Sequence, residues 1–327
     1  MIVKKDLGRI VLGCLPFGGV VDANDSIRVL SEAWRLGLRN FDVANLYGNG
    51  EAPELLRKTF NPNQFTPDYW VSIGLERVHD PNGVFSVQVQ KLNKVNVFKM
   101  ANEMLERLGT DKIAVLNIHG PDPTTYLGET IEALIQLRES GKVSKVSISN
   151  FLPIELEQVL DFEEKTGSCF EVFQFHGNLL EQRLINEFKV ILEQKNKIIY
   201  CFRPLARGLL GREYSRINHN PIGSRSTRGW RLNNYLNSTL LAQLELFQDI
   251  AKSFSISQTD LALYWLLNRS NIDGVVIGVR TIEQLYSLIG NQDFEIPNDL
   301  IRQFDEFLLT KEFRNISNAL PIEYFEK

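Results

Sequence analysis

The sequence predicts an α/β protein folded as a single-domain (β/α)8 TIM barrel, and three observations support this. Short apolar runs rich in Val, Ile and Phe alternate about eight times with stretches of helical periodicity, as in parallel βαβ units. About eight strand–helix pairs in roughly 290 residues fit a closed barrel better than an open sheet. The first apolar run leads into residues 13–19, Gly-Cys-Leu-Pro-Phe-Gly-Gly, which lack the G-x-G-x-x-G pattern of open dinucleotide-binding sheets.

Eight apolar runs are predicted to be strands. β-branched and aromatic residues are frequent in them, and strands buried on both faces of a parallel sheet have such continuous apolar runs. In chain order, the predicted strands are residues 9–13, 39–42, 69–73, 113–118, 143–148, 172–174, 198–201 and 274–277.

Helices are predicted between these strands, where apolar residues recur every three or four positions. They are residues 25–36, 97–108, 130–139, 153–164, 183–193, 243–253, 258–267 and 282–288. Asp25 or Ser26 is expected to cap the first helix, because a side-chain oxygen there can accept a hydrogen bond from a free backbone N–H. Four glycines stand where helices should end: Gly37, Gly109, Gly141 and Gly167.

The whole chain, residues 1–327, is expected to form this one domain. A long loop is expected at about residues 203–238, and a C-terminal helix and tail after residue 290. No stretch rich in Pro, Ser and Gly resembles an interdomain linker.

Charge is distributed unevenly along the chain. There are 36 Lys and Arg residues against 40 Asp and Glu, a formal net charge of −4, which argues against nucleic-acid or membrane-surface partners. Residues 203–231 nevertheless contain seven arginines and one acidic residue. This segment is either a solvated loop or the site of an anionic ligand.

The cysteines and the N-terminus indicate the compartment. Cys14, Cys169 and Cys201 are far apart and odd in number, so neither a disulfide framework nor a Cys-x-x-Cys metal site is predicted. The N-terminus lacks the apolar run of a signal peptide, and no segment approaches about 20 consecutive apolar residues. We therefore expect a cytoplasmic protein without a metal site.

Polar residues follow several predicted strands, and in a barrel the carboxyl ends of the strands surround one mouth. Asp42, Tyr47 and His119 lie at or just after such ends. A carboxylate, a phenol and an imidazole at one mouth form an acid/base cluster. Taken singly, each residue also fits a structural role: a turn cap, packing against a loop, and a strand-end hydrogen bond.

The order of these residues is distinctive. Residues 41–50 read Phe-Asp-Val-Ala-Asn-Leu-Tyr-Gly-Asn-Gly and are followed by Glu54. This segment resembles the Asp-Thr-Ala-x-x-Tyr-Gly-x-Gly segment of the aldo-keto reductases. Further segments match in the family's order: residues 105–111, 118–123, 141–143, 148–151, Gln174 with Asn178, 204–208 and 278–284. On this resemblance, the chain is identified as a member of the aldo-keto reductase family from about residue 7 to residue 290.

The resemblance implies a barrel that binds NADP(H) and passes hydride to a small-molecule carbonyl. Tyr47 would be the general acid, Asp42 its supporting carboxylate and His119 the residue that orients the substrate oxygen. The implied cofactor-binding residues fall into four groups. These are Ser149, Asn150 and Gln174 for the carboxamide; Phe202 for stacking on the nicotinamide; Pro204, Leu205, Arg207 and Gly208 for the pyrophosphate; and Arg280 with Gln284 for the adenosine end.

One departure from the family affects catalysis. The family's lysine at the end of the third strand falls on Gly74, which leaves Asp42 without its expected cation. Three explanations remain open: Arg77 or a cation from residues 203–231 replaces the lysine, the site runs reduced or different chemistry, or catalysis has been lost. Smaller departures are Leu288, where many members have asparagine, and Gly177, where many have tyrosine.

Four residues are candidates for the substrate: His176, Arg225, Arg228 and Trp230. The arginines favour an anionic group on the substrate. The expected function is an NADP(H)-dependent oxidoreductase acting on an aldehyde, ketone or sugar carbonyl. The alternative is a nucleotide-binding member of the family without standard reductase activity, either regulatory or a non-redox sugar-modifying enzyme.

Overall fold

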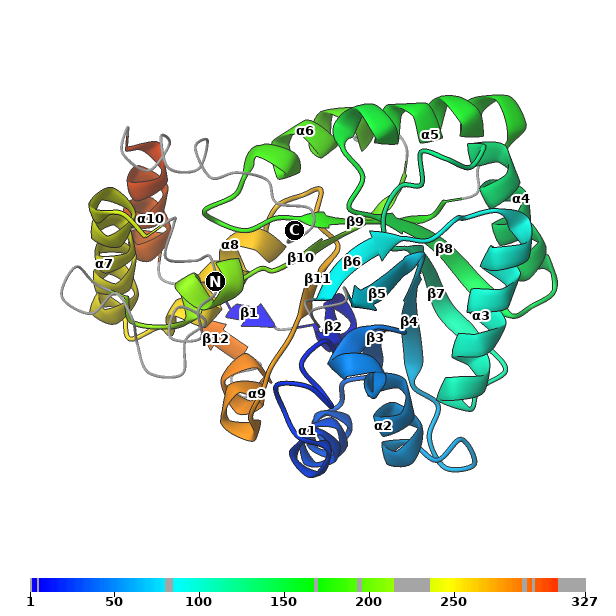
Figure 1. The fold of residues 1–327 in the computed structure, drawn as a ribbon. Coiled ribbons are helices and arrows are strands. Elements are labelled where there is room, and N and C mark those ends of the chain that lie inside the picture. Colours follow the sequence, from blue (N-terminus) through cyan, green and yellow to red (C-terminus); the bar gives the residue numbers. More distant parts are fainter. Residues whose placement is uncertain are drawn as a thin grey trace.

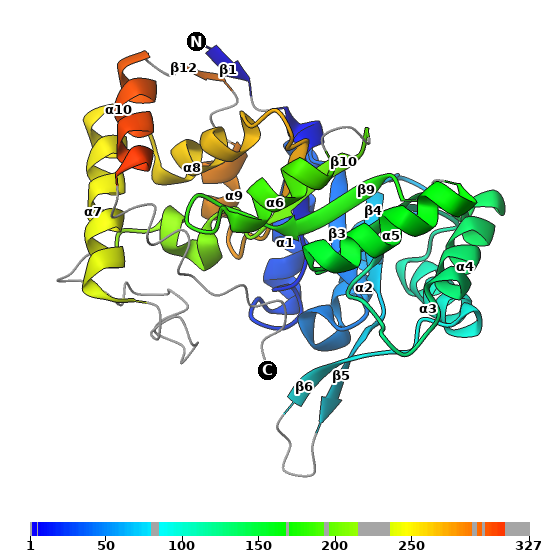
Figure 2. The same ribbon diagram turned by 90° about the horizontal axis from the view of Figure 1, so that it is seen from above.

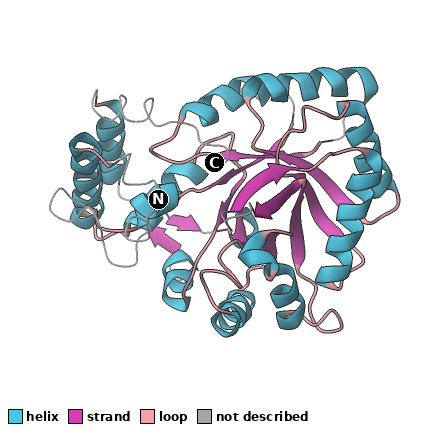
Figure 3. Ribbon diagram, in the orientation of Figure 1, coloured by secondary structure: helices cyan, strands magenta, loops and turns pink. Residues whose placement is uncertain are grey.

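A closed barrel of eight parallel strands forms the centre of the structure (Figure 1; Figure 3). In this computed structural model, the described residues are 2–4, 6–79, 85–167, 170–192, 196–214, 236–289, 293–295 and 298–310. Around the barrel, the strand order is β10-β11-β2-β3-β4-β7-β8-β9, and every neighbouring pair runs parallel. The predicted (β/α)8 fold is therefore confirmed.

All eight barrel strands coincide with predicted runs, and their ends differ by at most two residues. They are β2 (Ile10–Gly13), β3 (Asn40–Ala44), β4 (Asp68–Ile73), β7 (Ile113–Ile118), β8 (Val143–Ser149), β9 (Val172–His176), β10 (Ile198–Phe202) and β11 (Gly274–Ile277). The continuous apolar runs form strands because their side chains are buried on both faces, against the helices outside and the packed barrel inside.

The predicted helices are also present. They are α1 (Ala23–Arg35), α3 (Lys94–Leu108), α4 (Leu127–Glu139), α5 (Pro153–Thr166), α6 (Arg183–Leu192), α7 (Ser238–Ser253), α8 (Gln258–Leu267) and α9 (Ile282–Ile289). The predicted C-terminal helix is α10 (Asn298–Leu309), which lies beside α7 at one side of the barrel (Figure 1; Figure 2).

The start of α1 corrects one prediction. Asp22, not Asp25 or Ser26, is the cap: its side chain accepts a hydrogen bond from the Asp25 N–H at 2.9 Å. Ser26 lies inside the helix, where its hydroxyl donates to the Asp22 carbonyl oxygen at 2.6 Å. Helix α1 begins before the first residue of its apolar face, so a prediction based on the spacing of apolar residues starts the helix two residues too late.

Three features were not predicted. The short helix α2 (Ala52–Thr59) follows the Tyr47 segment, with Pro53 in its first turn. Directly after β4, the strands β5 (Leu75–His79) and β6 (Phe85–Val89) form an antiparallel hairpin that projects away from the barrel (Figure 2). A second small sheet pairs β1 (Ile2–Lys4) with β12 (Asp293–Glu295).

Among the described helices, none is both long and apolar enough to cross a membrane.

The barrel interior is filled below the mouth. The Trp70 and Tyr200 rings lie 4.6 Å apart between centroids, and the Trp70 Nε1–H donates to Asn40 Oδ1 at 3.1 Å. Gly274 stands opposite Tyr200 in the β10–β11 pair, and a Cβ there would lie 2.2 Å from Tyr200 Cε1 and 2.4 Å from the Arg9 carbonyl oxygen. The missing side chain at Gly274 therefore makes room for the Tyr200 ring.

Gly274→Ala should lower the free energy of unfolding by about 1–3 kcal/mol, because the backbone oxygen of Arg9 cannot move aside as a side chain could. Gly13→Ala on β2 is the matched control: its new Cβ would have its nearest contacts at 3.6 Å, an ordinary distance. Urea denaturation of both variants measures the difference. Equal losses would contradict the steric explanation.

Candidate active site

The barrel brings most of the predicted site residues to one rim. Asp42 lies near the carboxyl end of β3, His119 directly after β7, Ser149 at the end of β8, His176 at the end of β9 and Phe202 at the end of β10. All these strands are parallel members of one closed barrel, so their carboxyl ends surround the same mouth. The sequence-based expectation that these residues converge therefore agrees with the topology.

Tyr47 opens a 3-10 turn (Tyr47–Gly50) whose backbone is pressed against the segment after β2. The Gly48 N–H donates to the Leu15 carbonyl oxygen at 3.2 Å. Gly48 has φ of 59°, and a Cβ there would lie 1.6 Å from the Phe17 carbonyl oxygen. Only glycine fits this close backbone contact, which fixes the position of the preceding Tyr47.

Tyr47 and Asp42 are hydrogen-bonded to each other; the Asp42 side chain is buried, whereas Tyr47 is partly buried and reaches the mouth. Burial raises the pKa of Asp42 to about 7, and the hydrogen bond from Tyr47 opposes that rise. The pKa of Tyr47 lies well above its ordinary value, because of burial first and then the charge of Asp42 and the nearby Cys14. The charge of Arg203 acts in the opposite direction and lowers it.

His119 faces the tyrosine. The two rings meet edge to face, with centroids 5.8 Å apart. Burial lowers the pKa of His119 to about 4, so the imidazole is neutral at physiological pH. Its Nδ1 is buried and has no hydrogen-bond partner among the described residues. A neutral imidazole with one free ring nitrogen can share a proton with a ligand oxygen.

Gly74, the position that the resemblance predicts for the family's lysine, has a backbone conformation that disfavours a side chain. Gly74 has φ of +100°, and a Cβ there would lie 2.9 Å from Leu92 Cδ2. The Gly74 carbonyl oxygen accepts a hydrogen bond from the Gln90 N–H at 2.9 Å, at the base of the β5–β6 hairpin. A lysine would be strained here both by its backbone conformation and by the space available.

Ser149, Asn150 and Gln174 lie together at the ends of β8 and β9. Ser149 pairs with Gln174 in the strand register, and the Asn150 Nδ2 amide group donates to the Ser149 hydroxyl at 3.3 Å and to the His119 carbonyl oxygen at 2.7 Å. The Gln174 Nε2 is buried without a partner among the described residues. A buried amide donor without a partner fits a site for an acceptor group such as a carboxamide oxygen.

Phe202 forms a flat platform with His176. Their rings are nearly parallel, at 9°, with centroids 5.5 Å apart. The Arg203 guanidinium lies over the Phe202 ring at 5.8 Å from its centroid. His176 is only 3% exposed, and its Nε2 lies 2.7 Å from Glu181 Oε2, so the imidazole supports Phe202 from the protein side.

The turn after β10 has an unusual backbone. Arg203, Ala206 and Arg207 have φ of 58°, 47° and 57°, and Gly208 has φ of 101°. Each of the three non-glycine residues costs about 1–2 kcal/mol in this left-handed conformation. The turn contains the predicted residues Pro204 and Leu205 and continues into a 3-10 segment (Ala206–Gly211). Such strain persists only where surrounding contacts hold it.

Arg280 and Gln284 lie at the start of α9. The Arg280 N–H donates to Gln284 Oε1 at 2.9 Å, and the Gln284 N–H donates to Thr281 Oγ1 at 3.2 Å. Leu288, where the family often has asparagine, is 1% exposed and packs in the core.

Three predicted substrate residues, Arg225, Arg228 and Trp230, lie outside the described residues. Within the described part of the chain, no group of three or more His, Cys, Asp and Glu side chains is arranged to hold a metal ion.

Three features of the site were not predicted from the sequence. They are the buried Glu181, the hydrogen bond that Asn178 donates to it, and the effect of Cys14 on the pKa of Tyr47. Glu181 is a carboxylate directly after Leu179 and Leu180, both buried, and this placement was the one signal in the sequence. An acidic side chain next to two core residues is buried only when it has a partner.

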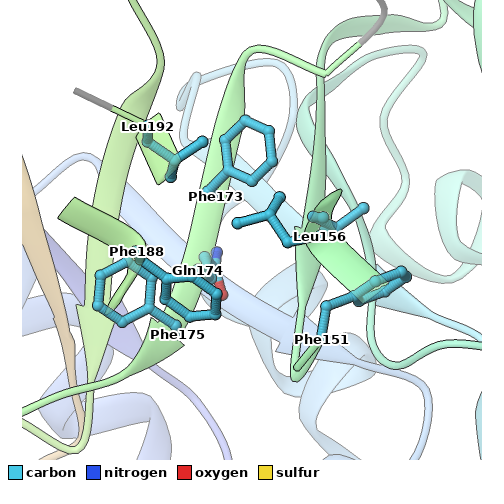
Figure 4. A pocket seen from close by; sticks show the side chains of 8 residues that line it. Phe151, Leu156, Phe173, Gln174, Phe175, Phe188 and Leu192 are labelled. Atoms are coloured by element: carbon cyan, nitrogen blue, oxygen red, sulfur yellow. The ribbon is translucent and has the colours of Figure 1, made fainter. Parts of the chain in front are cut away.

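A small cavity lies between strands β8 and β9 and helices α5 and α6 (Figure 4). Of its eight lining residues, Gln174 alone is polar, and the others include Phe151, Phe173 and Phe188. We attribute this cavity to imperfect packing of aromatic rings in the wall.

Comparison with known proteins agrees with the fold. The model of the Aldo/keto reductase family matches residues 9–309. The chain is 26% identical to the uncharacterized oxidoreductase YrpG of Bacillus subtilis over 313 residues, 92% of each chain. It is 28% identical to L-glyceraldehyde 3-phosphate reductase of Escherichia coli (strain K12) over 293 residues, 85% of this chain and 82% of that one. The fold matches glycerol dehydrogenase of Gluconobacter oxydans with a TM-score of 0.79 and 20% identity, covering 96% and 94% of the chains.

Asp42→Asn should stabilise the protein at pH 8 but not at pH 4. The Asp42 carboxyl keeps its proton up to about pH 7 when folded and loses it near pH 4 when unfolded, so wild-type stability falls between these values. The asparagine variant does not lose stability in this pH range, so at pH 8 its free energy of unfolding should exceed that of the wild type by about 2–4 kcal/mol. Urea denaturation across this range tests it, with the exposed Asp68→Asn as control. A gain that does not change with pH would refute the raised pKa.

Proposed function

The chain belongs to the aldo-keto reductase family, and from that premise we propose that it is an NADP(H)-dependent oxidoreductase that reduces a small aldehyde, ketone or sugar carbonyl. One observation carries the proposal: the hydrogen-bonded pair of Tyr47 and Asp42 faces the neutral His119 at the barrel mouth. Next to this group lie the Ser149, Asn150 and Gln174 side chains and the Phe202 ring.

Each of these side chains has a task in carbonyl reduction. When bound, NADPH supplies the hydride that reaches the carbonyl carbon. His119 orients the carbonyl oxygen through a hydrogen bond, and Tyr47 gives its phenolic proton to that oxygen, which leaves an alcohol. With a pKa of about 7, Asp42 carries a proton in part of the molecules at neutral pH and can return one to Tyr47. The free amide donor of Gln174 and the Phe202 ring would hold the nicotinamide carboxamide and ring.

The remaining cofactor contacts that we propose are to the pyrophosphate and to the adenosine end. The turn after β10, with Pro204, Leu205, Arg207 and Gly208, would cover the pyrophosphate. Arg280 and Gln284 would meet the adenosine end, where a guanidinium can bind a 2′-phosphate through two parallel hydrogen bonds. This argues for NADP(H) over NAD(H).

Arg203 is our candidate for the cation that replaces the missing lysine. Its charge lowers the pKa of Tyr47, and its guanidinium lies over Phe202 at the mouth. The other candidate, Arg77, donates instead to Asn49 Oδ1 in the turn that carries Tyr47. We therefore assign Arg203 to the electrostatics of the proton transfer and Arg77 to holding the Tyr47 turn.

The substrate is proposed to carry an anionic group. Arg203 at the mouth and the predicted Arg225, Arg228 and Trp230 would supply positive charge and an aromatic surface for it. The name of the Escherichia coli relative refers to a phosphorylated aldehyde. The buried free thiols of Cys14 and Cys201 fit a reducing compartment, and we propose the cytoplasm.

A second candidate function rests on Gly74. Because the lysine position is closed by the backbone, the protein could have kept nucleotide binding and given up turnover. Binding of NADPH without oxidation by any carbonyl would favour this candidate.

We expect NADPH to bind more tightly than NADH in a fluorescence titration, and a panel of neutral and anionic aldehydes and ketones to oxidise it. Tyr47→Phe should lower turnover by about 10²–10⁴-fold with NADPH affinity unchanged, because only the transferable proton is lost. Tyr264→Phe, on the outer helix α8, is the control. Turnover that survives Tyr47→Phe would exclude the phenol as the acid, and absence of nucleotide binding would exclude both candidate functions.

Arg203→Met should lower turnover about tenfold or more, because loss of the positive charge raises the pKa of Tyr47 and makes it a weaker acid. One nearby charge changes the pKa of a partly buried group by about one unit or more. Arg203→Lys should retain most of the activity. The comparison is Arg77→Gln, which can still donate to Asn49. Steady-state rates at saturating NADPH provide the measurement. If Arg77→Gln is the more damaging change, the assignment of the cation is reversed.

A further inference from the structure

A buried carboxylate connects the ring platform to the turn after β10. Glu181 lies between β9 and α6, with its side chain 12% exposed. Its Oε2 is 2.7 Å from His176 Nε2 and accepts a hydrogen bond from Asn178 Nδ2 at 2.5 Å, and its Oε1 is 3.5 Å from Arg207 Nη1. The exposed fractions of the His176 and Arg207 side chains are 3% and 10%.

Glu181 is ionised in this setting. The neighbouring His176, Arg207 and Asn178 outweigh the effect of burial and hold the pKa of Glu181 at about 2. Burial lowers the pKa of His176, which keeps the imidazole neutral at physiological pH. The Glu181 carboxylate and the Arg207 guanidinium therefore cancel each other's charge, and the neutral imidazole donates a hydrogen bond from its Nε2–H to the carboxylate.

The contacts of Glu181 lead to both parts of the proposed cofactor site. On one side, His176 is stacked against Phe202, the ring assigned to the nicotinamide. On the other side, Arg207 belongs to the left-handed turn assigned to the pyrophosphate. Asn178 adds a third connection, because its Nδ2 also donates to the Arg203 carbonyl oxygen at 3.2 Å.

Arg207 is directed by this contact. Its Nη1 points to Glu181, while its Nη2 is buried and has no hydrogen-bond partner among the described residues. A guanidinium held on one edge by a carboxylate presents its remaining donors in a fixed direction. A buried donor of this kind fits an oxyanion that arrives with a ligand.

We propose that Glu181 is a positioning residue for the cofactor, which fixes the Phe202 platform through His176 and aims Arg207 at the pyrophosphate. The inference rests on the proposed NADP(H) function and assigns to one carboxylate the joint placement of two contact points. Glu181 does not touch the cofactor and acts through these two side chains.

The test is cofactor affinity in Glu181→Gln, which keeps the size of the side chain and removes its charge. The dissociation constant for NADPH should rise about 10- to 100-fold, the range expected for a buried charge-assisted contact. The affinity for adenosine 2′-monophosphate, which carries no part of the pyrophosphate, should stay the same. Glu187→Gln on α6, where Glu187 pairs with Arg183, is the matched control.

A combination of variants separates positioning from a general loss of structure. Because the route through His176 and Phe202 remains, the double variant Glu181→Gln/Arg207→Gln should bind NADPH worse than Arg207→Gln alone, but by less than the loss that Glu181→Gln causes in the wild type. Should Glu181→Gln fail to fold, Glu181→Asp keeps the charge on a shorter side chain and should give a smaller loss of NADPH affinity, with the affinity for adenosine 2′-monophosphate unchanged. Unchanged NADPH affinity in a folded variant, equal losses for both ligands, or additive losses in the double variant would overturn the inference. Absence of NADPH binding by the wild type would overturn the proposed function as well, so the two failures are distinguishable.

Discussion

The mouth of the barrel is arranged around the burial of the Asp42 carboxyl beneath Tyr47. A carboxyl removed from water is costly to ionise, and its main compensation here is one hydrogen bond from a phenol. The surrounding structure holds the pair in place. The close contact of Gly48 with Phe17 fixes the turn that carries Tyr47, and the packed side chains inside the barrel prevent the Asp42 carboxyl from moving deeper into it. A buried carboxyl–phenol pair of this kind is useful to a proton-transfer site, since the carboxyl changes its charge close to neutral pH.

Much of the fold could be predicted because it depends on local pattern. A parallel strand buried on both faces has a continuous apolar run, so the strands were found almost to the residue. The convergence of Asp42, His119 and Phe202 followed from strand ends alone. Other features depend on contacts between distant residues. The hairpin begins at Gly74, whose conformation is set against Leu92, and the role of Glu181 appears only when β9 and the turn after β10 lie side by side. The cap of α1 was missed for a smaller reason, because helices start before their apolar face does.

The positive charges of the arginine-rich segment serve different purposes in the described part of the chain. Arg207 is neutralised by Glu181 inside the protein, whereas Arg203 acts on Tyr47 at the mouth. The excess of arginines seen in the sequence is therefore not one uniform patch. The charge of Arg207 is already balanced by Glu181 before any ligand binds. The number of arginines in the segment therefore overstates the positive electrostatic potential that a substrate meets at the mouth.

The hairpin after β4 makes Gly74 an architectural residue of this protein. The same left-handed glycine follows a barrel strand and starts the hairpin, so the path of the main chain from β4 into the hairpin depends on this one residue. A side chain at this position would have to be accompanied by a new course of the hairpin, because φ of +100° and the nearby Leu92 side chain both favour glycine. A positive charge that acts on Tyr47 therefore has to come from another strand end, and Arg203 directly after β10 provides one.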